Sequence, residues 1–131
     1  MRYLTVDEVA QINRSVLREG EPFVPKFGLL EAAIMRPQQS VFGSEAYGTI
    51  HLKAAALMHS LALNHAFAQG NKRTALVAVV AFYRFNDWWL VIDDSKAVDL
   101  TMRVVEGDLD VPRLAEELER YAHRLPPPRE Y

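Results

Sequence analysis

The segment from Lys72 to Asn86 constrains the fold most, because it follows a helical pattern and is apolar almost all the way round. A helix of this kind is normally buried at the centre of a domain. The chain has 131 residues, half of them hydrophobic, which suits one domain with a single core. The sequence therefore predicts a bundle of helices built around this central segment.

Five further helices are expected around it. They run from the Thr5–Glu8 capping box to Gly20, from Leu29 to Met35, from Thr49 to Asn64, from a cap at Asp94 or Ser95 to Gly107, and from Asp110 onward with Pro112 in the first turn. Between them, Glu21 to Gly28 has the composition of a loop, Val41 to Glu45 that of a small hairpin or flap, and Trp88 to Ile92 that of a short strand. About six helices and at most two short strands make the fold class mainly α. Residues 1–125 are expected to form a single domain, followed by a Pro-rich tail at 126–131.

The composition argues against several classes of protein. The net charge is −2 and the pI about 6.1, whereas a general nucleic-acid binder usually has a basic surplus, so no direct nucleic-acid partner is expected. The chain has no cysteine, which excludes disulfides and thiolate metal sites. No signal peptide is visible at the N-terminus, and the longest apolar run, Ala75 to Tyr83, is too short to cross a bilayer. We expect a cytoplasmic protein without a membrane partner.

A loop from His65 to Asn71 interrupts the pattern just before the central helix. The first turn of any helix has backbone N–H groups without partners and carries the positive end of the helix dipole, so it attracts anions. Gly70 allows a phosphate to approach the backbone closely. Lys72 and Arg73 add two cations that oppose the dipole, a cost that a bound anion would offset. The segment therefore favours a phosphate-binding site.

His65 lies one loop away from this anion site, and histidine is the usual general base near neutral pH. A base beside a phosphate site suggests phosphoryl-type transfer. Each residue has an ordinary interpretation when it is taken alone. These interpretations are a helix C-terminal side chain for His65, a core anchor for Phe67, a helix cap for Asn71, and a solvated first turn for Lys72 and Arg73. Their joint occurrence favours the functional interpretation, and Phe67 remains a core anchor in either case.

The nine residues from His65 to Arg73 resemble the motif of the Fic/Doc family. That motif reads His, often Pro, Phe, any residue, Asp or Glu, Gly, Asn, Gly or Lys, and Arg, and this chain has six fixed residue types in nine positions. The lysine version followed by Thr74 is similar to the Doc (death on curing) branch. The resemblance covers most of the chain, from the Thr5–Glu8 helix through the flap to residues 98–101. It implies a compact, single-domain helical bundle with a short β flap.

The resemblance also implies roles for the motif residues. His65 is the base that takes the proton of a target hydroxyl, and Gly70, Asn71, Lys72 and Arg73 hold the phosphates of ATP or another nucleoside triphosphate. The Doc branch is implied to be a kinase that acts on a translation factor such as elongation factor Tu. It is silenced by a small antitoxin with a helix-forming tail. A partner helix or strand is expected on an apolar groove, with Phe42 of the flap and the Trp88–Trp89 pair as possible contributors.

Gln69 stands where the family has a magnesium-binding acid, and an amide is a weak ligand for this ion. Leu76 stands where many AMP-transferring relatives carry a second arginine, which favours phosphoryl over AMP transfer. Three interpretations stay open: a Doc-like kinase, AMP transfer by the same site, and a binding module disarmed at Gln69. The segment Ser15 to Gly20 also fits a self-inhibitory pattern of the family, in which Glu19 would block Arg73. We interpret that match as a coincidence.

Overall fold

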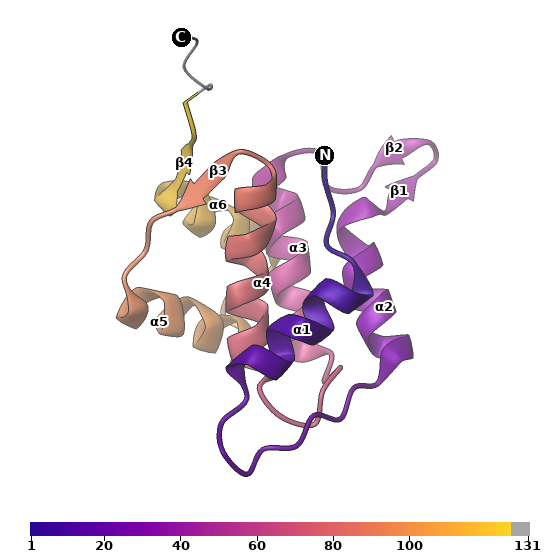
Figure 1. The fold of residues 1–131 in the computed structure, drawn as a ribbon. Coiled ribbons are helices and arrows are strands. Elements are labelled where there is room, and N and C mark those ends of the chain that lie inside the picture. Colours follow the sequence, from indigo (N-terminus) through magenta and orange to yellow (C-terminus); the bar gives the residue numbers. More distant parts are fainter. Residues whose placement is uncertain (127–131) are drawn as a thin grey trace, which may run out of the picture.

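Helix α4 (Asn71–Phe85) lies in the middle of the molecule and packs against α3 (Ile50–Leu63), which runs antiparallel beside it (Figure 1). The computed structural model describes residues 1–126. Three consecutive alanines, Ala54 to Ala56, are fully buried on α3. Their small side chains let the two helix axes approach closely, which forms the centre of the core.

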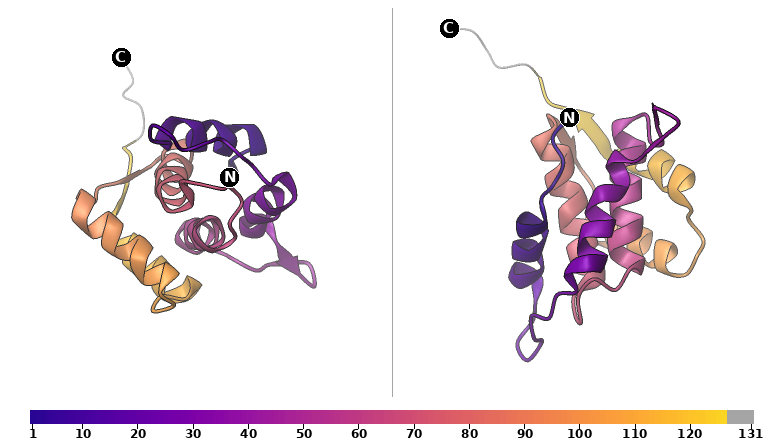
Figure 2. Two further views of the ribbon diagram at one scale, coloured as in Figure 1. Left: turned by 90° about the horizontal axis from the view of Figure 1, so that it is seen from below. Right: turned by 90° about the vertical axis from the view of Figure 1, so that its right-hand side faces the viewer.

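The other helices surround this pair. They are α1 (Val6–Val16), α2 (Phe27–Met35) followed by the short 3-10 helix η1 (Arg36–Gln38), α5 (Asp94–Val105) and α6 (Val111–Tyr121). Helix α1 packs on α4, α2 and α6 pack on α3, and α5 contacts both central helices (Figures 1 and 2). The predicted mainly α, compact bundle is confirmed. Among the described residues, no helix is long and apolar enough to cross a membrane.

Three helices begin where the sequence placed their start, and a fourth ends before its expected glycine. Thr5 and Glu8 form the predicted capping box of α1, Thr49 accepts a hydrogen bond from the N–H of Leu52 at the start of α3, and Asp110 does the same for Arg113 in α6. Gly107 follows α5 with a φ of 86°, as its position after the helix predicted. In each case the local sequence was sufficient to place the helix end.

The predicted flap is present as a hairpin of β1 (Ser40–Val41) and β2 (Ser44–Glu45). Its two turn residues, Phe42 and Gly43, both have positive φ values of 51° and 81°. Positive φ at both central positions is typical of the tight turn that matches the twist of a hairpin. The Phe42 side chain is fully exposed at this turn.

Three expected boundaries and the strand count were wrong. Helix α1 ends at Val16 instead of Gly20, because Leu17 turns to an extended conformation. Helix α2 begins at Phe27 instead of Leu29, which shortens the expected loop. Asp93 caps α5, one residue before Asp94.

The described residues contain four short strands instead of two. The Trp88–Ile92 run forms β3 (Trp88–Leu90), and it pairs with the unexpected β4 (Ala122–Arg124) directly after α6. Of the expected 126–131 tail, residues 127–131 lie outside the described part of the chain.

Candidate active site

The loop between α3 and α4 is held from outside by the segment that precedes α2. The N–H of Lys26 donates to the carbonyl of Ala66 at 2.7 Å, and the N–H of Ala68 donates to the carbonyl of Val24 at 3.0 Å. Two residues of the loop, His65 and Gly70, have positive φ values of 51° and 78°. A left-handed conformation is uncommon for a residue with a side chain, so the backbone at His65 is fixed by its surroundings.

Phe67 anchors the loop in the core, where its side chain is 2% exposed. Asn71 closes the loop around it: its Oδ1 accepts from the N–H of Phe67 at 3.0 Å, and its Nδ2 donates to the carbonyl of Phe67 at 2.7 Å. The Asn71 side chain is therefore engaged with the backbone, which leaves its own N–H in the first turn of α4 to face a ligand.

A cavity of about 270 Å³ lies between this loop and the start of α4. It brings together His65 and the motif residues from Gln69 to Arg73, with Ala62 of α3 and Val105 at the end of α5. The lining residues are Ala62, His65, Ala68, Gln69, Gly70, Asn71, Lys72, Arg73 and Val105. A histidine, helix N-terminal amides and two cations thus meet in one space, as the motif predicted. Val105 could not be assigned to the site from the sequence, since nothing in its local pattern distinguishes it from a core residue.

The Arg73 guanidinium is already engaged by groups from the end of α1. Its Nη2 lies 2.8 Å from Oε2 of Glu21, and its Nη1 donates to the carbonyl of Val16. The hydrogen bond from Arg73 holds the pKa of the Glu21 carboxyl below its ordinary value. The same hydrogen bond raises the pKa of Arg73. A phosphate that binds Arg73 must therefore compete with Glu21.

Glu19 does not take that position. Because α1 ends at Val16, Ser15 to Gly20 is not one helix, and Glu19 is exposed. Glu21, two residues beyond Glu19, contacts Arg73 instead.

A second residue that sequence analysis missed, Asn13 of α1, is fully buried against the loop. Its Nδ2 donates to the carbonyl of Gln69 at 2.9 Å and to the hydroxyl of Thr74 at 3.1 Å. The signal was a polar residue on the apolar face that contains Val9 and Val16. A buried amide normally requires hydrogen-bond partners, and these partners lie 56 and 61 residues away along the chain.

An adjoining cavity of about 320 Å³ lies between α4 and α5. Its lining surface is mostly apolar but includes three cations, Arg18, Lys72 and Arg73. The other lining residues are Leu76, Val98, Thr101 and Met102. Leu76, at the position where a second arginine was considered, forms part of the apolar wall. This surface continues directly from the motif cavity, because Lys72 and Arg73 line both.

The proposed contacts Phe42, Trp88 and Trp89 lie far from the motif loop. The flap and β3 are both at the end of the α3–α4 pair opposite to the loop, on different sides of the pair (Figures 1 and 2). Trp88 is partly buried and Trp89 is 51% exposed, as strand alternation predicted. One groove therefore does not unite Phe42 with the two tryptophans.

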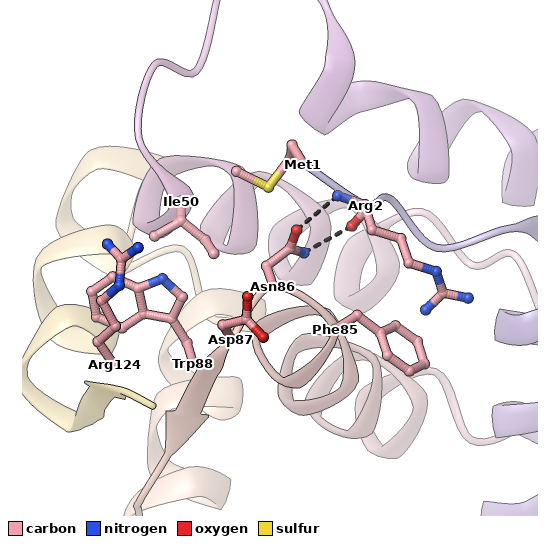
Figure 3. Close-up of a pocket in the computed structure, with 8 residues that line it drawn as sticks. All are labelled: Met1, Arg2, Ile50, Phe85, Asn86, Asp87, Trp88 and Arg124. Carbon is pink, nitrogen blue, oxygen red and sulfur yellow. Dashed lines mark hydrogen bonds between the residues drawn. The ribbon is translucent and has the colours of Figure 1, made fainter. Parts of the chain in front are cut away.

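Trp88 also lines a larger, open cavity of about 640 Å³ at that far end, between the N-terminus and the end of α4 (Figure 3). Two of its polar residues, Arg2 and Asn86, already have partners within the protein. Asn86 exchanges hydrogen bonds with the backbone of Arg2, whose guanidinium lies 3.8 Å from the centre of the Phe85 ring. Size alone would favour this cavity, but the motif histidine, the start of α4 and the cations Lys72 and Arg73 meet at the smaller one.

The motif cavity does not supply the ligands of a resident magnesium ion. Its polar side chains are an imidazole, two amides and two cations, without a carboxylate. Residues 1–126 also contain no group of three or more His, Asp or Glu side chains arranged to hold a metal. Magnesium prefers carboxylate and phosphate oxygens, so these residues do not fit the ion by themselves.

Comparison with known proteins agrees with this geometry. The sequence model described as "Fic/DOC family" matches residues 3–83, which extends from the segment before α1 to the last turns of α4. The chain is 44% identical over 110 residues to "Toxin Doc" of Mycolicibacterium smegmatis, which covers 82% of this chain and 85% of the relative. It is 30% identical over 122 residues to "Protein kinase doc" of Escherichia phage P1, with coverage of 92% and 95%. With the motif residues gathered around one cavity at the start of α4, the chain belongs to the Fic/Doc family.

Proposed function

We propose that this chain is a toxin of a toxin–antitoxin system that phosphorylates a protein hydroxyl. The observation that carries the proposal is the motif cavity, which joins His65 to the N-terminus of α4 and to Lys72 and Arg73. The names of the two relatives, a Doc toxin and a Doc protein kinase, support the same assignment. The target that we propose is a translation factor such as elongation factor Tu, in the cytoplasm.

In the proposed reaction, the oxygen of the target hydroxyl attacks the γ-phosphorus of ATP or another nucleoside triphosphate. The bond from that phosphorus to the β–γ bridging oxygen breaks, and the nucleoside diphosphate leaves. His65 takes the proton of the hydroxyl. Lys72, Arg73 and the first-turn amides of α4 stabilise the negative charge on the phosphoryl oxygens. Magnesium would enter with the nucleotide phosphates, because the cavity residues do not hold it alone.

The test is incubation of the protein with a cell extract and ATP labelled at either the α or the γ phosphate. Transfer of the γ label alone to a protein supports the kinase, and transfer of the α label identifies AMP transfer instead. Nucleotide binding without transfer of either label would favour the disarmed binding module. His65→Ala should lower the rate about 100- to 10,000-fold, as expected for loss of a general base, while nucleotide affinity stays nearly unchanged. A variant that keeps the native rate would remove His65 from the mechanism.

We further propose that a small antitoxin covers the apolar cavity between α4 and α5 with its helix-forming tail. Val98 is 58% exposed there, and Val77 and Val80 on the neighbouring face of α4 are 39% and 40% exposed. Arg18, Lys72 and Arg73 lie at one end of this cavity, so acidic side chains beside the apolar ones would complement it. A tail bound there would also block phosphate binding in the motif cavity, because Lys72 and Arg73 line both cavities.

Co-expression with a small neighbouring gene tests this partner. The protein expressed alone should arrest growth, and the antitoxin should relieve the arrest. Val98→Asp should retain toxicity but escape the antitoxin, whereas Trp89→Asp at the far end should be silenced normally. High-yield expression of the unmodified chain alone, without arrest, would contradict both the toxin and the partner.

A further inference from the structure

We infer that Asn13 is a positioning residue that orients the Gln69–Gly70 peptide so that its N–H faces the phosphate site. The inference rests on the proposed nucleotide-binding role of the motif cavity. Asn13 belongs to α1 and lies outside the motif, and its side chain is fully buried. Its two donor bonds, to Gln69 and to Thr74, join the last turn of the loop to the first turn of α4.

The orientation of the amide follows from its partners. The Gln69 carbonyl can only accept, so the atom of Asn13 that faces it must be the Nδ2 donor. Oδ1 then points elsewhere and has no hydrogen-bond partner within residues 1–126. An unpartnered buried oxygen costs free energy. This cost accompanies an orientation in which both hydrogens of the Asn13 amide are donated, one to Gln69 and one to Thr74.

The direction of the Gly70 N–H follows from the same bond. In a trans peptide the C=O and the N–H point in opposite directions, and no peptide bond in the described chain is cis. Because Asn13 holds the Gln69 carbonyl toward α1, the N–H of Gly70 points away from α1. Gly70 also lines the motif cavity together with His65 and Lys72. Asn13 therefore fixes a backbone donor on the side where a phosphate would bind.

The fit around residue 70 is tight for any side chain. A Cβ atom on Gly70 would lie 3.2 Å from Nδ2 of Asn13, closer than ordinary van der Waals contact, and the φ of 78° is itself unfavourable for other residues. Glycine at this position thus serves the approach of Asn13 as well as the approach of a ligand. Asn13 and the Gln69–Gly70 peptide therefore fit together, although Asn13 and Gln69 are 56 positions apart in the sequence.

Asn86 provides a matched control. It caps the C-terminal end of α4, opposite to the end that Asn13 contacts. Its Nδ2 also donates to two acceptors, the carbonyls of Arg2 and Phe82, both at 2.8 Å. Asn13→Leu and Asn86→Leu each remove such a pair, and both should lower the melting temperature. Only Asn13→Leu should weaken ATP binding, by about tenfold or more in calorimetry. Equal affinities for the native protein and Asn13→Leu, or equal losses in the two variants, would overturn the inference.

Amide hydrogen exchange of residues 66–74 supplies a readout that does not depend on nucleotide. Exchange in this segment should be faster in Asn13→Leu and unchanged in Asn86→Leu. If Asn13→Leu does not fold, Asn13→Ala, which removes the same donors without added bulk, serves in its place. If the native protein binds no nucleotide, the proposed function fails, and the exchange data still decide whether Asn13 holds the loop. Unchanged exchange in both Asn13 variants would sink the inference on its own.

Discussion

Gln69 is a neutral amide at the motif position where the family has a magnesium-binding acid, so this site lacks one negative charge. Its side chain is exposed at the motif cavity, while its backbone carbonyl is held by Asn13, so substitution of the side chain should leave the loop in place. We predict that Gln69→Asp and Gln69→Glu raise the transfer rate by about tenfold, equivalent to about 1.4 kcal/mol of barrier. A carboxylate would add the hard oxygen ligand that magnesium prefers.

Single-turnover rates across a magnesium titration measure this effect. The gain should be largest at low magnesium and should shrink as the metal saturates. Gln38→Glu on η1, remote from the motif cavity, adds the same charge and serves as control. If neither acid at position 69 raises the rate, Gln69 is not in a metal-facing position, and the binding-module interpretation gains support.

Glu21 and Arg73 should make stability depend on pH in one direction. The pKa of Glu21 is lowered in the folded protein by its hydrogen bond from Arg73, so the pair stabilises the fold above the ordinary glutamate value of 4.5. That contribution is lost as the pH falls through the lowered pKa. We predict that the native protein melts at a higher temperature than Glu21→Gln at pH 7, and that this difference shrinks as the pH falls through the lowered pKa of Glu21.

Calorimetric melting curves at several pH values check the direction. Glu19→Gln is the control, because Glu19 is exposed and has no salt bridge among the described residues. A difference between the native protein and Glu21→Gln that grows as the pH falls would contradict the assigned contact.

The flap is attached to α3 by a buried cation. Lys53 is 3% exposed, and its Nζ lies 3.1 Å from Oε1 of Glu45 in β2 and 3.5 Å from the carbonyl of Pro37. Glu45 is mostly exposed, so solvent screens the attraction. The burial of Lys53 is the larger effect, because a buried charge without its partner is costly.

We therefore predict an asymmetry between the two partners. Glu45→Ala should destabilise the protein by about 1–3 kcal/mol, since it leaves the Lys53 ammonium buried with a long contact to the Pro37 carbonyl and the Tyr3 ring 5.8 Å away. Lys53→Met should change stability by less than about 1 kcal/mol, because it replaces the buried charge with an apolar chain of similar length. Urea unfolding of both variants measures the difference. A larger loss in Lys53→Met than in Glu45→Ala would contradict this asymmetry, because both variants break the ion pair and only Glu45→Ala leaves the charge buried.

Helix boundaries followed from the sequence only where the determining group was nearby. Thr5, Thr49 and Asp110 are within three residues of the N–H groups that they cap, so their helices begin as predicted. The end of α1 depends on Leu17 turning away, where Arg73 binds the carbonyl of Val16 from another helix. Strand β4 likewise forms only by pairing with β3. The local sequence pattern predicted β3 itself, but it does not show this pairing or the contact of Arg73 with Val16.

At the scale of the whole molecule, the α3–α4 pair separates two ends with different properties. The motif cavity lies at one end, and the flap, β3 and the larger cavity lie at the other, about 22 Å away along α4 (Figure 1). The motif residues that line this cavity could be singled out from the sequence, because they are almost consecutive. Asn13, Glu21 and Val105 reach the site only through folding, so no sequence spacing could assign them.

Nucleotide binding in the motif cavity and in the larger cavity at the far end of α4 can be told apart by which variants lose the stabilisation that the nucleotide gives. A ligand that binds only the folded state at 100 times its Kd stabilises that state by about 2.7 kcal/mol. In a chain of this size the melting temperature should rise by roughly 10 °C. Lys72→Ala removes an exposed cation from the motif cavity and should reduce the shift, whereas Arg124→Ala in the larger cavity should preserve it. His65→Ala should also preserve the shift, because the base is needed for transfer and not for binding. Thermal melts of the three variants with and without ATP decide between the cavities: loss of the shift in Arg124→Ala, with full retention in Lys72→Ala, would move the nucleotide to the far end of α4 and end the proposed mechanism.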